Sequence, residues 1–110
     1  MQTRVEKSDG VAVVVIEGRV DGTTASDLGQ VLHDVVAAGD SRLVLDLEAV
    51  EYVGSAGLRE FVTALKKATQ QDGDLRLASP NERVTAILEL SGLSSILAIH
   101  STRGDAVGSF

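Results

Sequence analysis

The most informative stretch of the sequence is VLDLEAVEYVGSAGLREF, residues 44–61. It begins in an apolar, partly β-branched run, which predicts a short buried strand over residues 43–47. Residues 48–54 mix charged and small side chains, and we expect them to form a loop. Ser55 then opens a helix that we expect to run to about Gln71. The order strand, loop, helix is the unit from which parallel sheets are built.

Two further strand signals precede this stretch. Residues 3–7 alternate weakly between polar and apolar side chains, residues 8–10 (Ser-Asp-Gly) are typical of a tight turn, and residues 11–17 are almost wholly apolar. A continuous apolar run indicates a strand that is buried on both faces. We therefore predict a hairpin whose first strand is the antiparallel edge of the sheet.

Helical periodicity marks the segments between the strands. Thr24 and Asp27 have the spacing of a capping box, in which a hydroxyl and a carboxylate satisfy free amides of the first turn. Gly39 is typical of a helix end, because glycine accepts left-handed backbone geometry. The predicted apolar stripe of this helix is Leu28, Val31, Leu32, Val35 and Val36, and that of the helix from Ser55 is Leu58, Phe61, Val62 and Leu65.

The carboxyl-terminal third continues the alternation. Residues 75–78 predict a strand. The following Ser79-Pro80-Asn81-Glu82 predicts a helix start with Ser79 as N-cap, proline in the first turn and a glutamate three residues after the cap. We expect Gly92 to end that helix, residues 95–100 to form a last strand, and the tail from Thr102 to have little regular structure.

Strands and helices alternate through residues 1–110 without a repeat or a linker, which predicts a single domain of the α/β class. We predict a five-stranded, mixed, mostly parallel sheet with crossover helices. In such sheets partners and ligands bind at the carboxyl ends of the strands. Three predicted segments lie there: residues 18–23, residues 48–54 and the turn at Ser79.

The composition restricts the classes of function. The chain has 110 residues, a net charge of −6, no cysteine, one tyrosine, two phenylalanines and no tryptophan. An acidic chain without a basic cluster is a poor partner for nucleic acid, whose affinity comes chiefly from neutralised phosphates. The longest apolar run, residues 11–16, is much shorter than the roughly 20 residues that span a bilayer. We therefore expect a cytoplasmic protein without direct membrane insertion.

Residues for catalysis or metal binding are scarce. His33 lies off the apolar stripe of its helix and His100 lies at a strand end, and neither has a cysteine or a paired carboxylate motif nearby. The segment from Gly54 to Gly57 lacks both the spacing and the lysine of a nucleotide-binding loop. We expect no enzyme activity, no metal and no cofactor.

Ser55 allows two interpretations from its position alone. As an N-cap, its hydroxyl accepts a hydrogen bond from an amide of the first turn. As a phosphoacceptor, Ser55 would carry a phosphate group with about −1.5 to −2 charges at a helix start, where free amides and the helix dipole tolerate an anion. The residues alone do not choose between the two, and the cap role holds in either case.

The segment from Asp46 to Leu58 resembles the signature of the STAS domain, named for sulfate transporters and anti-sigma factor antagonists. In that family a strand ending in Asp-Leu leads through a spaced aromatic, here Tyr52, to a helix start of the form Ser-(Ser/Thr/Ala)-Gly-Leu. Gly54 stands where many members have an aspartate, and residues 104–110 offer little more than a turn of the family's last helix. The likeness extends to Gly18-Arg19-Val20-Asp21 and to a carboxyl-terminal pattern of Val84, Leu88, Ser91-Gly92-Leu93 and Ile99.

The resemblance implies a free-standing anti-sigma factor antagonist. In that class the unphosphorylated protein binds an anti-sigma factor serine kinase and frees the sigma factor. The kinase phosphorylates a serine at the start of the second helix, which ends binding, and a serine phosphatase resets the switch. That serine aligns with Ser55, the implied phosphoacceptor. The implied partner-binding residues are Asp21, Thr23, Gly54, Ser55, Ala56, Gly57 and Arg59.

A second function within the same family stays open. It is a STAS accessory subunit of a lipid ABC transporter that is not phosphorylated. Its members often lack the acidic residue before the serine, as this chain does at Gly54.

Overall fold

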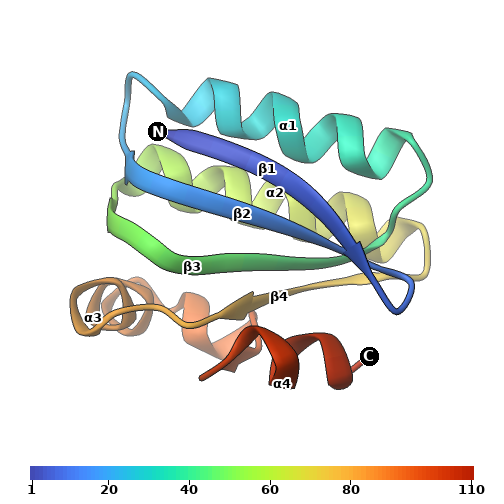
Figure 1. Cartoon of the computed structure of the whole chain (residues 1–110). Coiled ribbons are helices and arrows are strands. Elements are labelled where there is room, and N and C mark those ends of the chain that lie inside the picture. The colour runs from blue at the N-terminus through green and yellow to red at the C-terminus, as the bar shows by residue number, and fades with distance from the viewer.

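A computed structural model describes residues 1–110 as one five-stranded sheet with four α-helices (Figure 1). The strands are β1 (Gln2–Ser8), β2 (Val11–Val20), β3 (Arg42–Val53), β4 (Asp74–Ala78) and β5 (Ile99–His100). The helices are α1 (Ala25–Ala37), α2 (Ser55–Gln70), α3 (Glu82–Leu90) and α4 (Arg103–Gly108), with a short 3-10 helix at Leu93–Ser95. No helix combines the length and the apolar character that crossing a membrane requires.

The strand order is β1-β2-β3-β4-β5, in which β1 is antiparallel to β2 and every other neighbouring pair is parallel. This confirms the predicted mixed sheet with an antiparallel first edge. From β2 to β5 each new strand is added next to the previous one, so the sheet grows in one direction. Because crossovers between parallel strands are right-handed, the helices of these crossovers then lie on one face of the sheet. Buried residues of α1, α2 and α3 accordingly share one apolar cluster, while Ala106 of α4 belongs to a second cluster on the opposite face.

The residues of β2 alternate between these two clusters. Ala12, Val14 and Ile16 pack with the residues of α1 and α2, and Val11, Val13 and Val15 pack with Ala106. None of the six is more than 6% exposed. The strand is therefore buried on both faces, as its continuous apolar run predicts.

The central strands extend further than predicted. β3 continues to Val53 instead of ending at Leu47, and β2 continues to Val20. Their pairing is irregular at two places, and at each of them β3 contributes one extra residue: Val15↔Asp46 is followed by Glu17↔Ala49, and Gly18↔Val50 by Arg19↔Tyr52. Such bulges break the alternation of side chains, so residues 48–53 do not look like a strand in the sequence. Of the predicted loop over residues 48–54, only Gly54 lies outside regular structure.

The two long helices differ in how well periodicity predicted their buried faces. In α1 the residues Leu28, Leu32, Val35 and Val36 are buried and Val31 packs at the margin, as predicted. In α2 the fully buried residues are Gly57, Phe61, Ala64 and Ala68, so of the predicted stripe Phe61 is at the centre of the buried face and Leu58, Val62 and Leu65 are only partly buried. Leu58 and Leu65 pack at the side of the core. Small residues under the helix axis let α2 approach the sheet closely, and the larger side chains reach the core from its flank.

The start of α3 also differs from the prediction. The N-cap is Asn81, whose Oδ1 accepts a hydrogen bond of 2.8 Å from the Val84 amide. Ser79 does not cap the helix; its backbone is left-handed (φ 58°) and its hydroxyl donates to the Ser101 carbonyl oxygen at 3.2 Å. Asn81 is fixed from its other end as well, because its Nδ2 donates to the Val50 carbonyl oxygen at 2.9 Å. This hydrogen bond to β3 places Asn81, and not Ser79, at the N-cap of α3.

The carboxyl-terminal segment is more regular than predicted. The last strand is only Ile99–His100, and Leu93–Ser95 form a 3-10 helix before it. The tail folds into α4, with the Thr102 hydroxyl accepting from the Asp105 amide as its cap. The expectation of a weakly structured tail is therefore wrong, and Ala106 is fully buried against the sheet.

Candidate functional site

The carboxyl ends of β2, β3 and β4 lie at the same end of the sheet, where α1 and α2 begin (Figure 1). The Gly54 amide donates a hydrogen bond of 2.8 Å to the Val20 carbonyl oxygen, which ties the residue after β3 to the last residue of β2. This bond brings the segment with Asp21 and Thr23 beside the start of α2. We call the surface formed by residues 21–23, 54–56 and 59 the rim.

Ser55 is the first residue of α2, and Gly54 occupies the N-cap position with an extended backbone (φ −86°, ψ 177°). The Leu58 amide donates to the Gly54 carbonyl oxygen, and no side chain caps the helix. The interpretation of Ser55 as the N-cap is therefore wrong by one residue. Ser55 is exposed, and its hydroxyl makes no hydrogen bond within the chain. An exposed hydroxyl without a hydrogen bond is accessible to a second protein.

Gly57 lies beneath this surface. It is buried, and a Cβ atom there would lie 2.6 Å from Val20 Cγ1 and 2.9 Å from Val53 Cγ1. Glycine at this position lets the first turn of α2 rest directly on the ends of β2 and β3. Of the residues predicted to bind a partner, Gly57 thus positions the helix from below, whereas Ser55 and Arg59 are exposed.

The segment after β2 is ordered by Asp21. Its carboxylate accepts hydrogen bonds from the Thr23 amide at 2.9 Å and from the Thr23 hydroxyl at 2.7 Å. The hydroxyl of Thr23, followed by its amide, lowers the pKa of Asp21 below the usual range, because both groups stabilise the ionised form. Asp21 and Thr23 therefore form an ordered acidic corner directly after Val20, the residue to which Gly54 is bonded.

The predicted capping box of α1 is absent. The Thr24 hydroxyl accepts from the Asp21 amide at 3.0 Å and lies 3.1 Å from the Arg19 carbonyl oxygen, to which it donates. Thr24 is at the N-cap position but makes no side-chain bond to its helix. Its hydroxyl instead links Arg19 and Asp21 at the end of β2. This role depends on where β2 ends, and the spacing between Thr24 and Asp27 does not indicate it.

Arg59 in the rim and Arg19 next to it have no carboxylate partner. Arg59 is exposed on α2 and takes part in no ion pair. Arg19 lies over the ring of Tyr52, with its guanidinium carbon 4.8 Å from the ring centre. Sequence reasoning noted Tyr52 only as a spaced aromatic; the Arg19↔Tyr52 register that joins the two residues follows from the bulges in β3.

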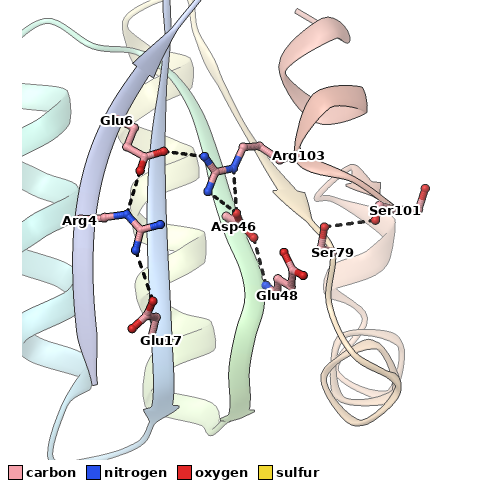
Figure 2. Close-up of polar contacts among 8 residues, drawn as sticks. All are labelled: Arg4, Glu6, Glu17, Asp46, Glu48, Ser79, Ser101 and Arg103. Carbon is pink, nitrogen blue, oxygen red and sulfur yellow. Dashed lines mark hydrogen bonds and ion pairs between the residues drawn. The ribbon is translucent and has the colours of Figure 1, made fainter.

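A second polar cluster lies on the face of the sheet that α4 covers, away from α1 and α2 (Figure 2). Arg103 of α4 donates two hydrogen bonds to Asp46 Oδ2, at 2.9 and 2.7 Å, and one of 2.6 Å to Glu6. Asp46 is 4% exposed, and the Glu48 amide bonds its other oxygen at 3.1 Å. Arg4 continues the cluster by bridging Glu6 and Glu17. Every buried polar side-chain atom has a partner, so this cluster is suited to anchoring α4 on the sheet.

A shallow pocket of about 110 Å³ adjoins this cluster at Gln2, Thr3, Arg4, Val15 and Glu17. Sites for small organic ligands are usually about 300–1,000 Å³. No group of three or more histidine, aspartate or glutamate side chains is arranged to hold a metal ion. The rim combines the exposed hydroxyl of Ser55 with the ordered carboxylate of Asp21 and the exposed Arg59.

Comparison with known proteins gives a consistent result. An anti-sigma-F factor antagonist of Mycobacterium tuberculosis, RsfB, is 35% identical over 105 residues, which cover 94% of this chain and 84% of that protein. The crystal structure of an anti-sigma factor antagonist from Mycobacterium paratuberculosis superimposes with a TM-score of 0.90 at 33% identity, covering 98% of this chain and 92% of that one.

The fold alone is shared with the anti-sigma factor antagonist SpoIIAA in its unphosphorylated form, at 15% identity and a TM-score of 0.82, with 96% and 93% of the two chains covered. The family model of the STAS domain matches residues 2–106, which is nearly the whole chain. The sheet order, the serine-bearing start of α2 and these matches agree: the chain belongs to the STAS domain family.

Proposed function

We propose that this protein is an anti-sigma factor antagonist that is switched off by phosphorylation of Ser55. Its unphosphorylated form binds an anti-sigma factor serine kinase through the rim and thereby releases the sigma factor. The observation that supports this most directly is the exposed Ser55 hydroxyl, which is free of hydrogen bonds at the first residue of α2. The two relatives from Mycobacterium species are anti-sigma factor antagonists, which supports the antagonist part of the proposal.

The proposed modification is chemically simple. The Ser55 oxygen attacks the terminal phosphorus of ATP, the bond to the ADP oxygen breaks, and the hydroxyl proton passes to a base of the kinase. A phosphatase then hydrolyses the phosphate ester and restores the hydroxyl. The chain itself acts by binding its partner and supplies only the acceptor hydroxyl of Ser55. We propose that phosphorylation and dephosphorylation take place in the cytoplasm.

The phosphate changes the rim without unfolding it. Phosphoserine carries about −1.5 to −2 charges at neutral pH, and the free amides of a helix start tolerate an anion there. The same charge is added to a rim that already carries the Asp21 carboxylate. A phosphate placed in an interface fitted to a neutral hydroxyl must lose its hydration, and like charges that face each other across an interface cost several kcal/mol, so a partner fitted to the unmodified rim loses affinity when phosphate is added.

The test is calorimetric titration of the candidate anti-sigma kinases with wild type, Ser55→Asp and Ser55→Ala. We expect Ser55→Asp to weaken binding by about 30-fold or more, which corresponds to about 2 kcal/mol. Ser55→Ala should bind like wild type and resist inactivation by kinase and ATP. Because the hydroxyl caps nothing, the alanine variant should lose less than the roughly 1 kcal/mol of stability that removing a serine cap costs.

Mapping of phosphate by mass spectrometry after incubation with kinase and ATP completes the test. Label on Ser55 supports the proposal, and label confined to another serine such as Ser26 or Ser79 contradicts it. If Ser55→Asp binds as tightly as wild type and Ser55 takes up no phosphate, the accessory subunit of a lipid transporter becomes the better interpretation.

A further inference from the structure

Ser55 and Arg59 lie one helical turn apart on the outer face of α2. Residues four apart in an α-helix have Cβ atoms about 5–6 Å from each other, so their side chains are neighbours. Both residues are exposed, and the buried side of the helix, with Gly57, Phe61, Ala64 and Ala68, points the other way. A group added to the Ser55 oxygen therefore extends from the helix within reach of the Arg59 guanidinium.

The Arg59 guanidinium is not engaged elsewhere. Arg59 has no ion-pair partner in the structure. The one acidic residue of α2 is Glu60, and its carboxylate lies against Gly29 of α1, where an added methyl group would overlap it. The neighbouring carboxylate is thus directed away, toward α1, and leaves Arg59 available.

This arrangement is particular to Ser55. Only two serines lie inside α-helices, and the other, Ser26 of α1, is followed four residues later by Gln30 instead of a cation. Gly54 adds to the effect, because at the residue before Ser55 it places no carboxylate that would compete for the guanidinium.

We infer that Arg59 binds the phosphate of phosphorylated Ser55 within the same chain. This inference rests on the proposed function, since it concerns the phosphorylated form. A guanidinium presents a planar fork of N–H donors that matches two oxygens of a phosphate. Phosphorylation then changes the rim twice: it adds an anion, and it withdraws the exposed cation that Arg59 offers to a partner.

The experiment uses the full chain with phosphoserine encoded directly at position 55, so that no kinase is needed. Phosphorus NMR follows the second ionisation of the phosphate between pH 4 and pH 8, which for free phosphoserine has a pKa of about 6. We expect the pKa in the parent protein to lie about 0.2–0.4 units below that in Arg59→Gln, because a nearby cation favours the dianion.

Lys66→Gln is the matched control. Lys66 is exposed on the same face of the same helix and has no ion pair, but eleven residues separate it from Ser55, roughly 16 Å along the axis. It should titrate like the parent. Equal pKa values in the parent and Arg59→Gln would overturn the inference, and so would a shift in Lys66→Gln as large as that in Arg59→Gln.

The same phosphorylated protein separates this inference from the proposed function. If the pKa is lowered by Arg59 but the protein still binds the anti-sigma kinase, the contact stands and the switching function fails. If binding is lost while the pKa is independent of Arg59, the switch stands and the inference fails.

Discussion

At the scale of single residues, Ser55 and Gly57 have opposite surroundings although two positions separate them. Ser55 points into solvent without a hydrogen bond, and Gly57 is buried on Val20 and Val53. The sequence indicates that a helix begins here, but glycine and serine are both accepted as N-caps, so it does not say which residue takes that position. The backbone bond from Gly54 to Val20 makes Gly54 the cap and leaves the serine hydroxyl free.

Gly57→Ala should destabilise the protein by about 1–3 kcal/mol, the usual cost of adding a methyl group to a packed core. The new Cβ atom would lie 2.6 Å from Val20 Cγ1, so the first turn of α2 must move away from the sheet. Urea unfolding measures the effect. Gly104→Ala is the control, because a Cβ atom in α4 meets nothing there within 4 Å and alanine favours a helix; it should be neutral or stabilising. A neutral Gly57→Ala would contradict the close packing described above.

At the scale of elements, local periodicity predicted some segments well and others poorly. β2 and α1 repeat apolar residues with the period of a strand and of a helix, and both were recognised. The predicted third strand is shorter than β3 because two bulges interrupt the alternation of apolar and polar side chains along β3. α4 was missed because six residues are too few for a periodic signal, and most of its stability comes from residues far away in the sequence.

Arg103→Met tests what holds α4. The variant leaves the Asp46 carboxylate, which is 4% exposed, without its two bonds from the guanidinium, and removes the bond to Glu6. We expect a loss of about 1–3 kcal/mol in the free energy of unfolding, since an unsatisfied buried acceptor costs that much. Amide hydrogen exchange should also become faster in residues 103–108.

Arg83→Met is the matched control, because Arg83 is exposed on α3 and has no ion pair. It should change stability by less than about 0.5 kcal/mol, as surface substitutions usually do. Unchanged exchange in α4 of Arg103→Met would show that Ala106 and the stacking of Arg76 on Phe110, at 4.0 Å, suffice to hold the helix.

At the scale of the whole molecule, stability should decrease in acid. The hydrogen bond from Arg4, followed by that from Arg103, lowers the pKa of Glu6, and Thr23 lowers that of Asp21. A carboxyl whose pKa is lower in the folded protein contributes stability above its unfolded pKa, about 4 for these groups, and loses it as the pH falls through the folded pKa.

Urea unfolding between pH 6 and pH 3 checks this. The free energy of unfolding should fall toward pH 3, and Glu6→Gln should make that fall less steep. Glu89→Gln, at an exposed carboxylate of α3 without an ion pair, is the control and should keep the slope of wild type. Identical slopes in Glu6→Gln and wild type would contradict the contribution of the Arg4–Glu6–Arg103 contacts.

The sequence by itself determined the α/β class, the hairpin at the sheet edge, the parallel order that follows from alternating strands and helices, and the placement of Ser55 at a helix start after the third strand. Each of these depends on residues that are neighbours in the chain. Only the tertiary structure decided that β3 runs to Val53, that Gly54 and Asn81 are the caps, and that the tail forms α4. These features depend on contacts such as Gly54 with Val20 and Arg103 with Asp46, between residues that only the folded chain brings together.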